Sequence, residues 1–152
     1  MARVITWRHA MYEGIQQEMR RDETVLYMGE TIRSYAISKA PDGSIIDLTK
    51  EFGEERVRDT AIAETAIIGM GVGAAMAGSR PICEILFADF LGVAFDEIFN
   101  QAAVTRYTTG GQATVPMVIK VGLHGAAPGL ASQHAHAGME CLFAHSPGLK
   151  IA

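Results

Sequence analysis

Three continuous apolar runs, separated by helix-like segments, constrain the fold of this chain more than any other feature. The runs cover residues 24–30 (TVLYMGE), 80–87 (RPICEILF) and 115–123 (VPMVIKVGL). Continuous runs of this kind are typical of strands buried on both faces of a parallel sheet. With a shorter strand expected at 56–60 (RVRDT), the alternation predicts an α/β fold in three layers, with a mostly parallel central sheet and helices on both faces.

Helix and turn signals predict the segments between these strands. Thr6 is a suitable cap for a first helix. The helices are expected at residues 7–21, at 64–78 with Gly78 as its end, at 89–107 and at 138–146. The remaining segments are predicted as a loop at 31–44, a short helix at 47–52 ended by Gly53, and the opening of a further strand at 149–152.

Length and composition indicate one globular domain and exclude several classes of protein. The chain has 152 residues, of which 49% are hydrophobic, and a net charge of −4 with scattered basic residues, so nucleic acid is not an expected partner. No apolar stretch is long enough to cross a membrane and no signal peptide is recognised, which predicts a cytoplasmic or mitochondrial-matrix location. Cys83 and Cys141 are interpreted as small core residues in a reducing compartment.

Reactive side chains follow the ends of the predicted strands. In an open α/β sheet, ligands bind outside the carboxyl ends of the strands. The residues expected there are Glu30, Glu64, Phe87, Asp89, His124 and His134.

Glu64 opens a helix made otherwise of Thr, Ala, Gly, Ile, Val and Met, and its charge needs an explanation. The helix dipole favours a carboxylate in the first turn by about 0.3–1 kcal/mol, which is one reading. A group that exchanges protons is another, because burial raises the pKa of a carboxyl while the dipole lowers it. Further along the same helix, Gly69, Gly73 and Ala77 form a stripe that suits close packing, either within the domain or against another subunit.

Two other motifs are weaker. Residues 69–74 match the G-x-G-x-x-A pattern of a nicotinamide-dinucleotide site, but they lie too far past the preceding strand, so this reading is kept only as a minor alternative. His134 and His136 form an HxH pair without a third or fourth ligand at suitable spacing, so no metal site is expected. His134 is interpreted as a polar contact to a ligand.

Several segments, taken together, resemble the β subunit of thiamine-diphosphate-dependent 2-oxo acid dehydrogenases, the E1 component of pyruvate, branched-chain or acetoin type. They are LYMGE, FGEERVRDTAIAE, GMGVGAAMAGSRPICEILFADF, SQHAH and FAHSPGLKIA. The resemblance implies that Glu64 hydrogen-bonds N1′ of the cofactor's aminopyrimidine and so promotes loss of the proton at the thiazolium C2. It also implies that Glu30, Ile62 and Phe87 contact the pyrimidine and that His134 faces the substrate.

The resemblance further implies the partners and the reaction. These are an E1 α subunit that holds Mg²⁺ and the diphosphate, a second β subunit, and a lipoyl-bearing E2 component that takes the acyl group after oxidative decarboxylation of a 2-oxo acid. The "ILFADF" segment is nearer to acetoin-type members than to the pyruvate type. Family β subunits carry a second α/β domain after the "PGLK" segment, so residues 1–152 are expected to be the pyrimidine-binding domain alone, as a fragment or as one piece of a split enzyme. A non-catalytic assembly or regulatory fragment that binds an α subunit is the alternative.

Overall fold

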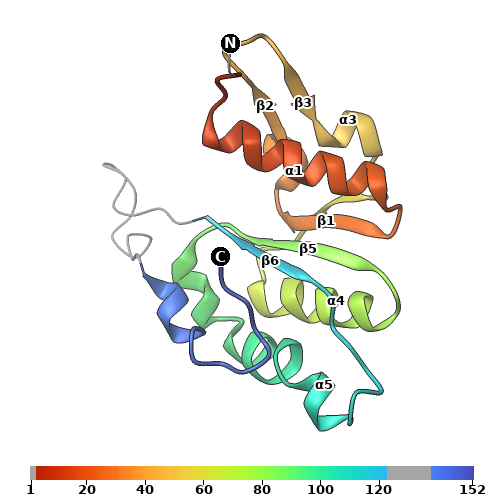
Figure 1. Ribbon diagram of the computed structural model, residues 1–152, viewed down its shortest axis with the longest axis vertical. Coiled ribbons are helices and arrows are strands. Elements are labelled where there is room, and N and C mark those ends of the chain that lie inside the picture. Colours follow the sequence, from red (N-terminus) through yellow and green to blue (C-terminus); the bar gives the residue numbers. More distant parts are fainter. Residues whose placement is uncertain (1–2, 123–137) are drawn as a thin grey trace.

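A four-stranded parallel sheet forms the centre of the molecule. The computed structural model describes residues 3–122 and 138–152. The strands are β1 (Val25–Glu30), β4 (Val57–Thr60), β5 (Arg80–Ile85) and β6 (Val118–Val121), in the order β4-β1-β5-β6. All three pairings are parallel, so the carboxyl ends of the strands lie at one edge of the sheet (Figure 1). The predicted α/β class and mostly parallel sheet are confirmed.

One face of the sheet is covered by α1 (Trp7–Arg21). Thr6 caps this helix as predicted, because its hydroxyl accepts a hydrogen bond from the backbone N–H of His9 at 3.1 Å. The buried residues shared by the helix, the sheet and the neighbouring hairpin are Tyr12, Ile15, Met19, Val25, Tyr27, Ile32, Ala36, Ile46, Leu48, Val57 and Ile82.

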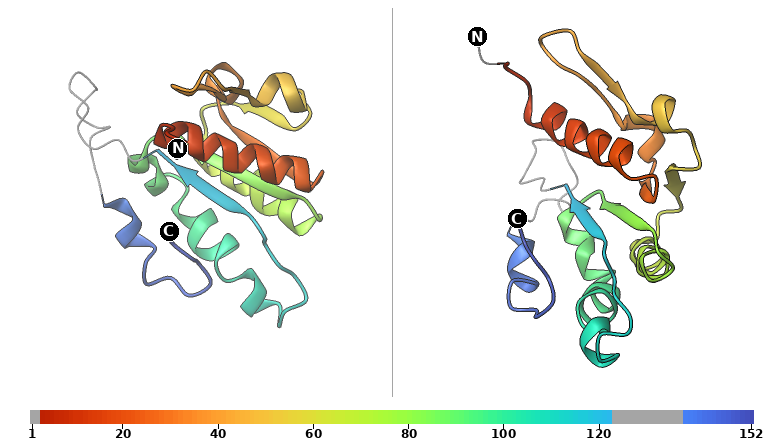
Figure 2. Two further views of the ribbon diagram at one scale, coloured as in Figure 1. Left: turned by 45° about the horizontal axis from the view of Figure 1, so that its top comes forward. Right: turned by 45° about the vertical axis from the view of Figure 1, so that its right-hand side comes forward.

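The opposite face is covered by α4 (Glu64–Met76) and by the segment that follows β5. Figure 2 shows these elements on the side of the sheet away from α1. On the strands, Met28, Cys83 and Ile85 alternate with the residues of the first set and belong to this second core. The other buried residues of the second core come from the covering segments; they are Ile67, Ile68, Val72, Leu91, Ala94, Ile98 and Phe143. The predicted three layers are therefore present. Among the described residues, no helix combines the length and the apolar character needed to cross a membrane.

The loop predicted at 31–44 is wrong, because this segment has regular structure. It contains α2 (Ile32–Tyr35) and the strand β2 (Ile37–Lys39), which pairs antiparallel with β3 (Ile45–Asp47). Fully buried His9 holds the hairpin against α1, with its two ring nitrogens 3.2 Å from the hydroxyls of Ser38 and Ser44. The short helix after the hairpin is confirmed as α3 (Leu48–Phe52), followed by Gly53 with a positive φ.

The continuous helix predicted at 89–107 is also wrong. The segment breaks into a 3₁₀ turn, η1 (Ala88–Gly92), a π-helical stretch, η2 (Glu97–Ala102), and a short α5 (Thr105–Thr108). Gly92 disfavours a continuous helix, and the Thr105 hydroxyl bonds back to the carbonyl of Gln101, in competition with the backbone ladder.

Three further expectations near the C-terminus need correction. The helix predicted at 138–146 is only the 3₁₀ turn η4 (Met139–Leu142), and residues 149–152 form no strand. Of the strand predicted at 115–123, the described residues 115–122 form only β6. Cys83 is buried as expected, but Cys141 lies on the short turn and is exposed.

The glycines of α4 do not pack as the predicted stripe. Gly71 makes the close contact inside the domain, because a Cβ there would lie 2.4 Å from Sγ of Cys83 and 2.8 Å from Cε of Met117. Gly69 faces the Glu97 side chain, and Gly73 has open space on its outer side. The tight seam between α4 and β5 therefore runs through Gly71.

This difference gives a matched pair of substitutions on one helix. Gly71→Ala is expected to lower the free energy of unfolding by about 1–3 kcal/mol, because the added methyl overfills the contact with Cys83. Gly73→Ala should be neutral or stabilising by up to about 1 kcal/mol, because alanine favours the helix and the methyl meets no atom. Urea unfolding of the two variants measures both effects. Equal free energies of unfolding for the two variants would contradict the close contact of Gly71 with Cys83.

Candidate functional site

The candidate site lies at the carboxyl edge of the sheet, on the α4 side. Glu30 ends β1 and is in register with Thr60, which ends β4. Since Met28 belongs to the α4-side core and side chains alternate along a strand, Glu30 also faces that side. Helix α4 begins four residues after β4, so Glu64 lies at the same edge. The predicted gathering of Glu30 and Glu64 at this edge agrees with the strand order.

Glu64 is half-buried in the first turn of α4. The cap residue is Ala63, which has no side chain able to accept a hydrogen bond from the helix. The next residue fixes the start of the helix, because the Thr65 hydroxyl donates to the carbonyl oxygen of Val93 at 2.8 Å. Within the described part of the chain, the Glu64 carboxylate has neither a hydrogen-bond partner nor an ion-pair partner. It is therefore available to a ligand with a donor group.

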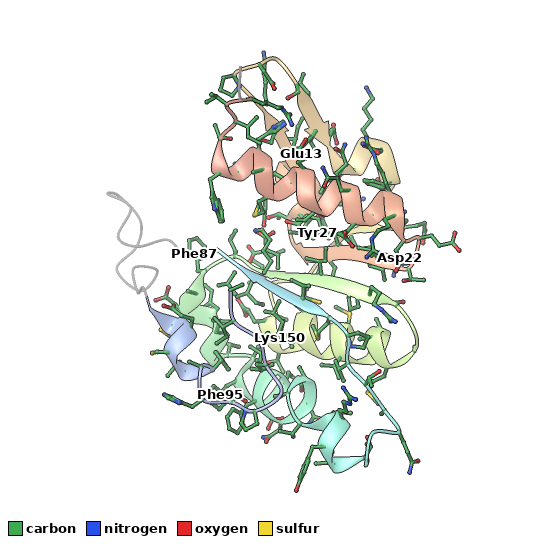
Figure 3. All side chains as sticks on the ribbon, viewed as in Figure 1. Glu13, Asp22, Tyr27, Phe87, Phe95 and Lys150 are labelled. Atoms are coloured by element: carbon green, nitrogen blue, oxygen red, sulfur yellow. The ribbon has the colours of Figure 1, made fainter. Side chains whose placement is uncertain are left out.

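Two apolar side chains belong to the same region. Ile62 precedes Glu64 closely in the sequence, and Phe87 follows the end of β5. Ile62, two residues before Glu64, is 74% exposed. Phe87 follows β5 in an extended conformation, and its ring packs edge-on against Phe90 with 6.0 Å between the ring centroids. Figure 3 shows Phe87 where β5 ends. An exposed isoleucine and a half-buried phenylalanine are suited to contact a flat, apolar ring.

The other predicted site residues are placed less completely. Glu30 is half-buried at the end of β1, and Asp89 lies in η1. His124 and His134 fall outside the described residues, so the predicted contact between His134 and a substrate stays a prediction.

A buried charged cluster next to this edge was missed in the sequence. Glu84, only 4% exposed, accepts a hydrogen bond from the Tyr27 hydroxyl and pairs with Nζ of Lys120 at 2.7 Å. Burial, with Glu84 as the second cause, raises the pKa of Tyr27, so the phenol remains a donor. The sequence did hold a signal for this cluster, because each of two apolar runs contains one charged residue in its interior, Glu84 in one and Lys120 in the other. The cluster joins β1, β5 and β6 on the α1 side of the sheet (Figure 3 labels Tyr27).

A comparison with models of protein families shows to which family the chain belongs. The model of the transketolase pyrimidine-binding domain matches residues 3–152. The chain belongs to this family. The position of the glycines in α4 agrees, because all of them lie inside the helix rather than at a strand-to-helix turn, as a dinucleotide fingerprint would require.

Several curated relatives of the chain are β subunits of an acetoin oxidoreductase or of pyruvate dehydrogenase. The chain is 43% identical to the β subunit of acetoin:2,6-dichlorophenolindophenol oxidoreductase from Cupriavidus necator, over 99% of this chain and 46% of the relative. It is 44% identical to the pyruvate dehydrogenase E1 component subunit beta of Rickettsia felis (97% and 44%) and 40% identical to the mitochondrial one of Bos taurus (97% and 40%). The resemblance found in the sequence is confirmed. The chain spans less than half the length of these relatives.

A solved structure shows the same fold. It is a split-gene transketolase, described as an inactive β4 tetramer, with a TM-score of 0.64 and 16% identity over 96% of this chain and 41% of that chain.

The described residues fit the pyrimidine half of thiamine diphosphate. Two carboxyl groups, Glu30 and Glu64, can accept hydrogen bonds from amino N–H groups or share a proton with a ring nitrogen, and Ile62 and Phe87 supply apolar contacts. For the diphosphate half, residues 3–122 and 138–152 offer no comparable set of side chains near Glu30. Arg33, the cation nearest to Glu30 in sequence, is already paired with Asp59 and Glu54. Among the described residues, no group of three or more His, Cys, Asp or Glu side chains could hold a metal ion.

Proposed function

We propose that this chain is the pyrimidine-binding domain of the β subunit of a thiamine-diphosphate-dependent 2-oxo acid or acetoin dehydrogenase. The observation that carries the proposal is the half-buried Glu64 carboxylate, which has no partner among the described residues and lies at the same sheet edge as Glu30 and Phe87. When bound, thiamine diphosphate would supply an acidic carbon that, once it has lost its proton, can attack a carbonyl group. By the family resemblance, an α subunit would hold Mg²⁺ and the diphosphate.

The role of each residue follows from its chemistry. Glu64 would share a proton with the ring nitrogen N1′ of the pyrimidine: its protonated carboxyl group would donate to N1′, and its carboxylate, which the first turn of the helix favours, would accept from N1′–H. Glu30 accepts from the edge of the same ring. Ile62 and Phe87 exclude water from the ring and fix its plane. His134 is assigned to the substrate, by resemblance alone.

The exposed face of α4 is the proposed contact with the α subunit. Residues on this face follow helical spacing and carry no charge; they are Ala66, Met70, Gly73 and Ala77. Met70 is 51% exposed, and Ile62 extends the apolar surface towards the candidate site. Glu64 lies on the other side of α4, in one row with the sheet-facing Ile68 and Gly71, so a partner on this face would reach it only past the N-terminal end of the helix. The contact therefore centres on Gly73 and its exposed neighbours rather than on Gly69, which Glu97 partly covers.

A charge on this face should break the complex without unfolding the chain. Met70→Lys is expected to weaken binding to the α subunit at least tenfold, because a buried lysine would have no partner there. The control is Gln17→Lys on α1, which is exposed on the opposite side of the sheet and should bind normally. Calorimetric titration with an α subunit measures both constants. Unchanged binding by Met70→Lys would place the contact elsewhere.

The complex also separates the catalytic proposal from the assembly alternative. With the α subunit, thiamine diphosphate and Mg²⁺, the complex should reduce 2,6-dichlorophenolindophenol when pyruvate, a branched-chain 2-oxo acid or acetoin is added. Binding of the α subunit without turnover of any of these would favour a non-catalytic assembly role. We extend the proposal to pairing of two β chains, to acyl transfer to the lipoyl group of E2, and to the cytoplasm or mitochondrial matrix as the compartment.

A further inference from the structure

The segment that follows Glu30 has an unusual backbone. Thr31 has φ 48° and ψ 27°, the left-handed region, and it is the one non-glycine residue with positive φ in the described part of the chain. A β-branched residue rarely adopts this conformation, so surrounding contacts must hold it. The left-handed residue ends β1 abruptly and turns the chain into α2. The carboxylate of Glu30 is therefore presented by the last residue before a sharp bend.

Three contacts hold the bend. Ile32 is fully buried in the α1-side core. The carboxylate of Asp59, next to the end of β4, accepts hydrogen bonds from the backbone N–H of Arg33 at 2.8 Å and from its Nε at 3.0 Å. The hydroxyl of Tyr35 reaches back and donates to the backbone carbonyl of Glu30 at 2.8 Å. Two neighbouring strand ends are thus tied together through one turn of helix.

Tyr35 is well suited to this contact. Its ring packs against the α1-side core, so the position of the hydroxyl is fixed. Burial raises the pKa of Tyr35, and the hydroxyl therefore stays a donor across the working range of an enzyme. The C-terminal end of α2 is held as well, because a guanidinium nitrogen of Arg8 donates to the Tyr35 carbonyl at 2.7 Å.

We propose that Tyr35 is a positioning residue that fixes the orientation of Glu30 towards the bound pyrimidine, with Asp59 as the second anchor of the same turn. The inference depends on the proposed function, in which Glu30 contacts the cofactor. Tyr35 does not touch the cofactor. It acts by holding the backbone of Glu30, so that the carboxylate is oriented before the ligand arrives.

A double-mutant cycle tests this coupling in the complex of the full chain with its α subunit. Calorimetry with thiamine diphosphate and Mg²⁺ gives the dissociation constant, which is a readout independent of activity. Tyr35→Phe removes only the hydroxyl and is expected to raise the dissociation constant about 5- to 10-fold. In a Glu30→Ala background, the same change should have less than a twofold effect, because the group that it positions is gone. Tyr107→Phe, at an 87% exposed tyrosine, is the control and should bind as the unaltered chain does.

The outcomes distinguish the two levels of the proposal. If Tyr35→Phe weakens binding equally in both backgrounds, or does not weaken it in either, the positioning role is overturned while the contact of Glu30 can stand. If Glu30→Ala alone leaves the dissociation constant unchanged, the contact between Glu30 and the cofactor fails, and the positioning role fails with it. Thermal unfolding of each complex without cofactor, expected to agree within a few degrees, shows that a change in affinity is not a loss of folded protein.

Discussion

Glu64→Gln is expected to lower turnover by the reconstituted α/β complex about 100-fold or more. Glutamine keeps the size and a hydrogen-bonding oxygen but cannot carry the negative charge that the first turn of α4 favours. Loss of a proton-transfer partner typically costs 10²–10⁴-fold in rate. Steady-state turnover at saturating cofactor, with pyruvate or acetoin as substrate, measures the effect.

Glu97 provides the matched control for this substitution. It is also a half-buried glutamate that contacts α4, since its carboxyl group lies beside Gly69. Glu97→Gln should change turnover less than threefold, because a neutral amide can make the same packing contact. Near-normal turnover by Glu64→Gln, or an equal loss in both variants, would refute the catalytic assignment of Glu64.

Lys120→Met is expected to lower the free energy of unfolding by about 3–5 kcal/mol. The substitution leaves the carboxylate of Glu84 buried, with only the hydroxyl of Tyr27 as a described partner. A buried charge without a counter-ion costs far more than the pair gains over neutral side chains of similar size. Urea unfolding at neutral pH measures the difference.

The double variant Glu84→Gln with Lys120→Met is the informative companion. It removes both charges and retains an oxygen that can accept from Tyr27. Its stability should recover most of the loss, since the penalty comes from the unpaired charge rather than from the missing ion pair. A double variant as unstable as Lys120→Met would show that the lysine matters by its packing alone.

Periodicity and turn chemistry determined the sheet, α1, α3 and α4 correctly, because each signal is local. The apolar runs predicted strands that are covered on both faces, and Thr6 predicted the start of a helix. The segment 31–44 could not be recognised, because its hairpin depends on a distant histidine, His9, which bonds two serines across the layer. The break of 89–107 arises from competing bonds within a segment whose composition suits a helix.

The candidate site was predictable to the same extent as the topology. Parallel strand order places Glu30 and Glu64 at one edge without any knowledge of side chains. The hydrogen bond from Tyr35 to the Glu30 carbonyl was not predictable, because it depends on the left-handed backbone at Thr31. A threonine in the sequence does not predict that conformation. The role of Gly71 was missed for a related reason: helical spacing alone does not tell which small residue lies against the sheet.

The two thiols differ in a way that is useful for chemical labelling. Burial raises the pKa of Cys83 to about 12, so the nucleophilic thiolate is scarce near neutral pH and the sulfur is shielded behind α4. Cys141 is exposed on its short turn. The folded chain therefore offers a single reactive sulfur, and a maleimide fluorophore can be attached there as a reporter of complex formation without disturbing the seam at Gly71.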